Sequence, residues 1–164
     1  MQVSIKTFDE LTIHELYQIL RLRSEVFVVE QDCVYQDVDN KDQKALHIMG
    51  MKDGQVVAYT RVFKPGDYFD NVSIGRVVVS QEQRQYGLGK QIMLASLAAI
   101  EQRFPDKPIE ISAQSYLLKF YTDLGFSAFG EEYLEDGIPH RRMLKEWITL
   151  TFSPLQFDSK NLIL

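Results

Sequence analysis

The spacing of apolar residues predicts one long helix near the start of the chain. Thr12 and Glu15 form a capping box, in which the threonine hydroxyl accepts from the Glu15 amide and the glutamate reaches back to the Thr12 amide. Leu16, Ile19, Leu20, Arg23 and Phe27 then follow helical spacing, which places them on one face of a helix. We therefore expect a short strand, Val3 to Phe8, and then a helix that ends near Val28.

Short apolar runs between turn residues predict strands through the rest of the chain. Their β-branched and aromatic side chains suit a pleated, half-buried surface. Asp53-Gly54 and Asp136-Gly137 are turn signals, because glycine tolerates the positive φ that a tight hairpin demands. The expected strands are Leu46 to Met51, Gln55 to Phe63, Val72 to Val79, Ile109 to Ala113, Phe126 to Tyr133 and Arg141 to Trp147.

Two more helices are expected, and the order of elements predicts the fold class. Helical spacing returns between Leu88 and Phe104, and a shorter helix is expected from Ser115 to Leu124, with Gly125 as its stop. The strand, helix and strand between Val72 and Ala113 predict one right-handed parallel crossover. The predicted fold is α+β: a mixed, mostly antiparallel sheet flanked by helices.

In two segments the apolar residues follow neither helical nor strand spacing. Residues 31–44 hold four aspartates among few apolar residues, so we expect a surface loop. Residues 148–164 form a tail whose apolar positions favour packing on the domain or on a partner, as in a homodimer contact. Because no repeat, linker or low-complexity tract divides the chain, we expect one domain, residues 1–147, followed by this tail.

Composition narrows the class of protein. The 164 residues are 45% hydrophobic and 25% charged, as in an ordinary soluble domain. The formal net charge of -5 argues against nucleic acid or an anionic membrane as partner. With no signal core and no apolar run of roughly 18 residues, we expect a cytoplasmic protein. One cysteine and three scattered histidines predict no disulfide and no metal site.

A glycine loop, Arg84-Gln85-Tyr86-Gly87-Leu88-Gly89, lies between a buried strand and a helix. A helix N-terminus exposes unpaired amides, and glycine lets a phosphate approach them without obstruction. The loop therefore suits a pyrophosphate, although a plain tight turn would use the same glycines. The phosphate-loop and dinucleotide fingerprints are both incomplete, which disfavours a nucleotide-binding domain.

Two motifs at matching distance resemble one family. Arg84-x-x-Gly87-x-Gly89 resembles the R/Q-x-x-G-x-G/A signature of the GCN5-related N-acetyltransferases (GNAT), and Phe120-Tyr121-x-x-x-Gly125-Phe126 resembles their F-Y-x-x-x-G-F segment. Residues 22–31 and 135–140 resemble the ElaA-like branch of that family. The resemblance covers residues 16–147 and implies an N-acetyltransferase with acetyl-CoA as its co-substrate.

The resemblance also implies how the coenzyme is held. The strand before the glycine loop and its parallel partner splay apart, backbone groups of the first strand pair with pantetheine, and loop amides cradle the pyrophosphate. A backbone amide of the same strand supplies the oxyanion donor. The implied coenzyme-binding residues are Val77, Val78, Val79, Arg84, Gln85, Tyr86, Gly87, Leu88, Gly89 and Lys90.

Acyl transfer to an amine also needs an acid and a base. Tyr121 is the candidate acid, because a neutral phenol can protonate the departing thiolate, although the same position would suit a core residue. Relatives carry a glutamate on the strand before the glycine loop, whereas this strand has Ser73, Gly75 and Arg76. The base is thus a water chain or one of Glu25, Glu30, His47, Glu110 and His140.

Two functions of different classes follow. The first is an enzyme that acetylates a small-molecule or peptide amine, by direct attack on the thioester through a tetrahedral intermediate. The second is a non-catalytic acyl-CoA sensor, suggested by the missing strand carboxylate. A covalent Cys33 intermediate is disfavoured, because no histidine or asparagine spacing supports a catalytic pair.

Overall fold

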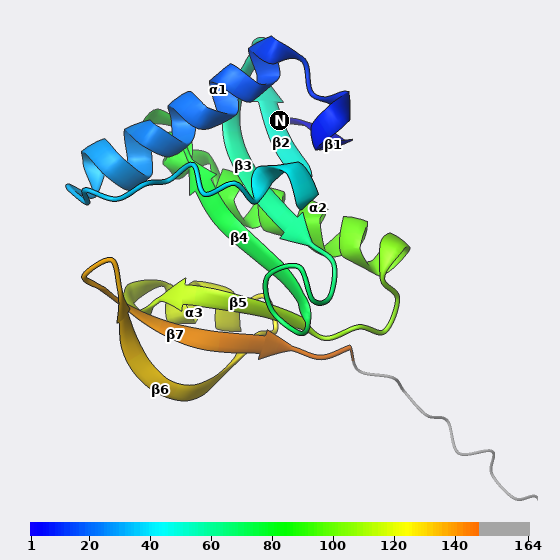
Figure 1. The fold of residues 1–164 in the computed structure, drawn as a ribbon, viewed down its shortest axis with the longest axis vertical. Helices are drawn as coiled ribbons and strands as arrows, with labels where there is room; N and C mark the ends of the chain where they lie inside the picture. The colour runs from blue at the N-terminus through cyan, green and yellow to red at the C-terminus, as the bar shows by residue number, and fades with distance from the viewer. Residues whose placement is uncertain (148–164) are drawn as a thin grey trace, which may run out of the picture.

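A seven-stranded sheet runs through residues 1–147, the part of the chain that the computed structural model describes (Figure 1). All neighbouring strands are antiparallel except β4 and β5, which are parallel as expected. Across the sheet the strands follow the order β1 (Gln2–Thr7), β2 (Leu46–Lys52), β3 (Gln55–Phe63), β4 (Val72–Val79), β5 (Ile109–Gln114), β7 (Ile138–Lys145) and β6 (Ser127–Glu135).

The first helix begins at the capping box and changes its winding near its end. In α1 (Ile13–Arg23), the Thr12 hydroxyl accepts from the Glu15 amide at 3.2 Å, and the Glu15 carboxylate accepts from the Thr12 amide at 2.8 Å. The chain then continues as a π-helical segment, Ser24–Glu30, two residues past the predicted end. π-helical turns are rare in proteins, and those that occur are often found at functional sites. This one borders the cavity between β4 and β5.

Helices cover both faces of the sheet and build two cores. On one face α1 packs Ile19 and Leu22 on Met49 and Tyr59. On the other face α2 (Leu88–Arg103) covers the centre of the sheet with the larger core, which the short helix α3 (Leu118–Thr122) joins (Figure 1). Alternate residues of β2 and β3 point to opposite faces, so both faces of these strands are buried.

β4 and β5 pair only at their beginnings. Val72 lies opposite Ile109 and Ser73 opposite Glu110, after which the two strands diverge into a V. On its other edge β4 carries a bulge: Arg76 and Val77 both face Thr60 of β3, and Arg76 takes a positive φ of 51°. The sheet therefore opens at its middle, with an unpaired edge on each arm.

The expectation that residues 31–44 form only a surface loop is wrong for two aspartates. Asp37 and Asp42 are 7% and 4% exposed. They pair with two buried arginines, since Arg23 donates to both carboxylates at 2.8 Å and Arg61 donates to Asp42 at 2.9 Å. A buried guanidinium without such partners would be costly, so the loop is drawn inward.

Other boundaries differ by a few residues. The last strand begins at Ile138 instead of Arg141, which places His140 within it. The expected helix from Ser115 to Leu124 is a 3₁₀ turn followed by α3, and Gly125 follows with a φ of 89°. Among residues 1–147, no helix combines the length and apolar character that a membrane span requires. The expected tail, 148–164, lies outside the described residues.

Candidate active site

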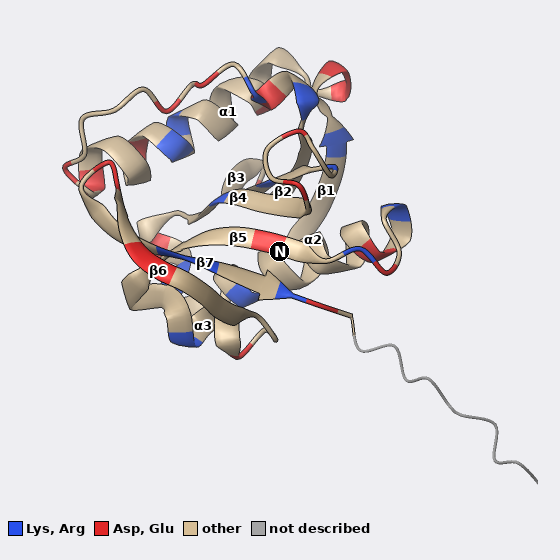
Figure 2. Ribbon diagram, turned by 60° about the horizontal axis from the view of Figure 1, so that its bottom comes forward, with Lys and Arg blue, Asp and Glu red and all other residues tan. Residues whose placement is uncertain are grey.

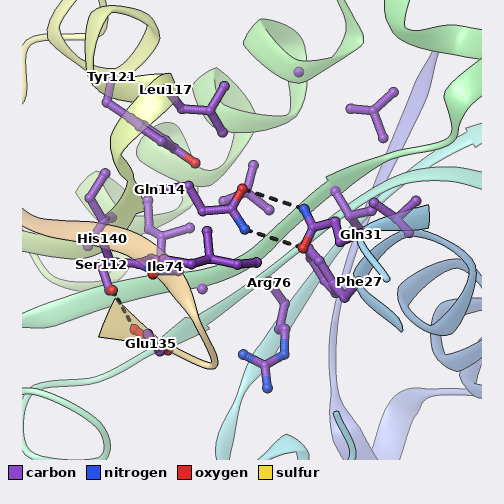
Figure 3. A pocket seen from close by; sticks show the side chains of 18 of the residues that line it. Phe27, Gln31, Ile74, Arg76, Ser112, Gln114, Leu117, Tyr121, Glu135 and His140 are labelled. Carbon is purple, nitrogen blue, oxygen red and sulfur yellow. Dashed lines mark hydrogen bonds between the residues drawn. The ribbon is translucent and has the colours of Figure 1, made fainter. Parts of the chain in front are cut away.

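A cavity of about 540 Å³ occupies the V between β4 and β5 (Figure 3). Its walls come from segments far apart in the chain: the π-helical segment, both diverging strands, the glycine loop, α3 and the β6–β7 hairpin. At one side of its mouth, Gln31 and Gln114 exchange side-chain amide hydrogen bonds of 3.5 and 3.3 Å. The tip of the hairpin reaches the same region, where Cys33 Sγ donates to the Asp136 carbonyl at 3.4 Å.

The glycine loop forms the N-terminus of α2. Gly87 has a φ of 68° and open space where a Cβ would stand. The first intrahelical bond runs from the Gln91 amide to the Gly87 carbonyl at 3.3 Å. The amides of residues 88–90 precede that bond and are therefore available, together with the positive end of the helix dipole. These residues fit a pyrophosphate.

Arg84 is engaged with Glu30 rather than pointing freely at the loop. Its two terminal nitrogens donate to the two Glu30 oxygens at 2.6 and 2.7 Å, and its Nε donates to the Val79 carbonyl at 3.2 Å. The hydrogen-bonded carboxylate of Glu30 raises the pKa of Arg84, so the guanidinium stays charged. Both residues line the cavity beside the loop.

Of the ten implied coenzyme-binding residues, seven line the cavity: Val77, Val78, Val79, Arg84, Gly87, Gly89 and Lys90. The side chains of the other three lie elsewhere. Leu88 is buried in the core under α2, Tyr86 is exposed with Lys52 over its ring, and Gln85 is exposed. A backbone role in phosphate binding would need only the amides of these three residues.

Tyr121 belongs both to the core and to the cavity wall. Only 5% of it is exposed, and its ring packs edge-on against Phe120 and Phe126. Its hydroxyl points into the cavity (Figure 3). Burial raises the pKa of the Tyr121 hydroxyl, which therefore remains protonated at neutral pH and can donate.

Three of the candidate bases lie outside the cavity lining. Glu25 pairs with Arg21 at 2.9 Å on the exposed surface of the helix. Glu110 is buried where β4 and β5 still pair, and it is held by Arg142 and by Asn71. Both carboxylates are held by other residues outside the cavity lining, so neither glutamate is placed to take a proton from an amine in the cavity.

His47, the third of these, lies fully buried in β2. Its ring contacts the Tyr59 hydroxyl at 2.8 Å and the Asp42 carbonyl at 3.0 Å. Burial lowers the pKa of His47, so the ring is neutral. The side chain lies on the same face of the sheet as its cross-strand neighbour Arg61, but its ring contacts Tyr59 and Asp42 and does not line the cavity.

Two candidates do line the cavity. Glu30 lies beside the glycine loop in its pair with Arg84, and His140 lies at the hairpin. His140 Nδ1 lies 2.8 Å from the Ile138 carbonyl, which only accepts, so Nδ1 carries the proton. The ring stacks on Tyr133 at a centroid distance of 6.2 Å.

Sequence reasoning missed a polar group at the hairpin end. Glu135 lies on β6 just before the turn, and its Oε2 accepts from Ser112 Oγ at 2.8 Å across the sheet. Ser112 Oγ also lies 2.5 Å from the Tyr133 hydroxyl. The available signal was the Asp136-Gly137 turn, which places the residue before it in the hairpin that borders the cavity.

The lining charges divide the cavity into two ends. Arg61 and Arg76 are offset by Asp37, Asp39 and Asp42. Among residues 1–147, Lys90 at the glycine loop and Glu135 at the hairpin form no ion pair. Figure 2 shows acidic residues along β6 close to the β6–β7 turn. One end thus attracts an anion and the other a cation.

Comparison with known proteins agrees with this architecture. The acetyltransferase (GNAT) domain model matches residues 9–147. Protein ElaA of Escherichia coli is 45% identical over 142 residues, covering 85% of this chain and 93% of that protein. A crystal structure of an acyl-CoA N-acyltransferase from Pseudomonas aeruginosa superposes with a TM-score of 0.84 at 45% identity, covering 88% of this chain and 99% of that one. The crystal structure of Escherichia coli ElaA gives a TM-score of 0.83 at 40% identity, covering 89% and 100%.

Proposed function

The chain belongs to the GNAT acetyltransferase family, and from that premise we propose that it transfers an acetyl group from acetyl-CoA to a primary amine. The observation that carries the proposal is the cavity in the V, with helix amides and Lys90 at one end and Glu135 at the other. A pyrophosphate suits the first end and a protonated amine the second. The thioester would lie between them, near Tyr121.

The open edge of β4 supports this placement of the coenzyme. Beyond Ser73 the strand has no β5 partner, so backbone groups near Val77 and Val79 face the V without a ladder partner. A buried backbone group needs a hydrogen bond, and the two amides of pantetheine can supply one. The pantetheine arm would therefore add to β4 as a short strand and lead from the glycine loop to the cavity centre.

Tyr121 would act on the departing sulfur. The amine nitrogen attacks the thioester carbonyl, the C–N bond forms and the C–S bond then breaks. The Tyr121 hydroxyl gives its proton to the thiolate and regains one from the nitrogen, which becomes an amide. A backbone amide at the β4 bulge, near Val77, would stabilise the oxyanion.

A ligand titration followed by thermal unfolding tests the proposal. A ligand that binds only the folded protein stabilises it by about 2.7 kcal/mol at a hundredfold excess over Kd. We expect acetyl-CoA and desulfo-CoA to raise Tm and ATP to leave it unchanged. No shift with any coenzyme would reject the proposal. A shift without turnover on any primary amine would favour the acyl-CoA sensor instead.

A further inference from the structure

The hydrogen bonds around Ser112 fix the orientation of the Glu135 carboxylate. Ser112 has one hydroxyl proton, and the Glu135 carboxylate only accepts, so Ser112 donates to Glu135 Oε2. The Tyr133 hydroxyl must then donate to Ser112 Oγ. The resulting chain runs from Tyr133 through Ser112 to Glu135, and it holds the carboxylate in one orientation in the cavity wall.

The second oxygen of Glu135 is left for a ligand. None of residues 1–147 hydrogen-bonds to Glu135 Oε1 or forms an ion pair with this carboxylate. The three arginines that line the cavity, Arg61, Arg76 and Arg84, already have carboxylate partners. A partly buried carboxylate without a cation, fixed by two hydroxyl-bearing side chains, is suited to binding one.

An aromatic group also lines the cavity near this carboxylate. Phe63, Tyr68 and Phe69 pack together from β3 and the β3–β4 connection, and all three line the cavity. Burial and the negative charge of Glu135 both raise the pKa of Tyr68. The three rings therefore add apolar surface to the cavity near Glu135, which suits an apolar stem and offers few hydrogen-bond partners to hydroxyl groups.

We propose that Glu135 binds the ammonium group of the acceptor and takes its proton, and that the acceptor is a primary alkylamine with an apolar stem. This inference rests on the proposed function. Glu135 receives one proton from R–NH₃⁺ and releases it to solvent, which leaves R–NH₂ with the lone pair that attacks the thioester. The second nitrogen proton leaves through Tyr121 to the thiolate, so the products are the amide, free thiol and one proton. Ser112 and Tyr133 are positioning residues.

A matched pair of acceptors separates this role from a structural one. Phenethylamine is protonated at pH 7.5, whereas O-benzylhydroxylamine has nearly the same shape but a neutral amino group. Removing a general base or an ammonium ligand should affect only the protonated acceptor. For Glu135→Gln we expect kcat/KM to fall about 100-fold with phenethylamine and less than about threefold with O-benzylhydroxylamine.

The control variant is Glu131→Gln, which changes an exposed residue of the same strand outside the cavity lining. It should keep both rates within about twofold of the wild type. Tm and the shift caused by desulfo-CoA verify that each variant is folded. Ser112→Ala should give an intermediate loss with phenethylamine only. Glucosamine, an amine with several hydroxyls, should be at least about tenfold poorer than phenethylamine in wild-type kcat/KM.

The outcomes distinguish the two proposals. Equal losses of Glu135→Gln with both acceptors, or no loss with either, would overturn the role of Glu135 and leave the acetyltransferase activity in place. Glucosamine acetylated as well as phenethylamine would overturn the apolar-stem class. A wild-type protein that binds desulfo-CoA but acetylates neither phenethylamine nor O-benzylhydroxylamine would overturn the apolar-stem class. Only a lack of turnover with every primary amine tested, glucosamine included, would overturn the proposed function as well.

Discussion

Arg84 and Glu30, 54 residues apart, form a two-pronged ion pair with N–O distances of 2.6 and 2.7 Å. Because Arg84 Nε also donates to the Val79 carbonyl, one guanidinium joins the end of the first helix, the end of β4 and the glycine loop. The position of the loop relative to the V therefore depends on a side chain from a distant segment. Glu30 and Arg84 were predicted for different roles, and the structure brings them into one contact.

Replacing Tyr121 with phenylalanine removes the hydroxyl that points into the cavity and keeps the ring packing. We expect the turnover rate to fall at least about tenfold, while coenzyme binding stays nearly intact. Steady-state rates and desulfo-CoA titrations of the variant measure both. An unchanged rate would remove Tyr121 from the mechanism.

Gly87→Ala should weaken coenzyme binding beyond its effect on stability. A left-handed alanine costs about 1–2 kcal/mol, and at the helix N-terminus it also disturbs the amides that would hold the pyrophosphate. Gly130 is a matched control, because it has the same φ of 68° and the same open space but lies outside the cavity lining. We expect both variants to lose similar stability in urea unfolding and only Gly87→Ala to lose affinity for desulfo-CoA, by about tenfold. Equal affinities in the two would argue that the loop is only a turn.

Asp42→Asn should destabilise the fold strongly. One Asp42 oxygen accepts from both Arg23 and Arg61, at 2.8 and 2.9 Å, and both guanidinium groups are buried. Breaking a buried pair costs about 3–5 kcal/mol, whereas an exposed pair contributes about 0.5 kcal/mol or less. Asp123→Asn, which removes the exposed pair with Lys119, is the control. Similar urea midpoints for the two variants would contradict this view of the network.

His47 should make stability depend on pH. Burial lowers its pKa in the folded state below the ordinary histidine value of 6.5, so the unfolded chain takes up the proton first as pH falls. The contribution is fully present above about pH 6.5 and is lost below it, by up to about 1.4 kcal/mol per pH unit. Urea unfolding at pH 7.5 and pH 5.5 measures the loss.

His47→Gln removes the titrating ring, so we expect the difference in unfolding free energy between pH 7.5 and pH 5.5 to shrink. His14 is exposed near the start of α1, and His14→Gln should keep the pH dependence of the wild type. A His47 variant that retains the full difference would assign the pH dependence to other groups.

Local patterns in the sequence determined most elements and the glycine loop at one end of the cavity. The capping box at Thr12, the hairpin turn at Gly54 and the glycine loop before α2 all depend on residues close together in the chain. Their conformations follow from φ preferences and from unpaired amides at helix ends, which a sequence displays directly. The same motifs identified the family, whose domain model matches residues 9–147.

Only the tertiary structure decided which polar side chains meet. The sequence displays Asp42, Glu110 and Glu135 as similar carboxylates, but each meets different partners from other elements. Asp42 pairs with Arg23 and Arg61, Glu110 pairs with Arg142, and Glu135 accepts from Ser112. Those pairings depend on the order of the strands and on where β4 and β5 separate. A charged side chain can be buried only where another element places a partner beside it, because the partner offsets the cost of desolvation. Glu110 thus lies where the sheet is closed, whereas Glu135 faces the cavity with one oxygen available.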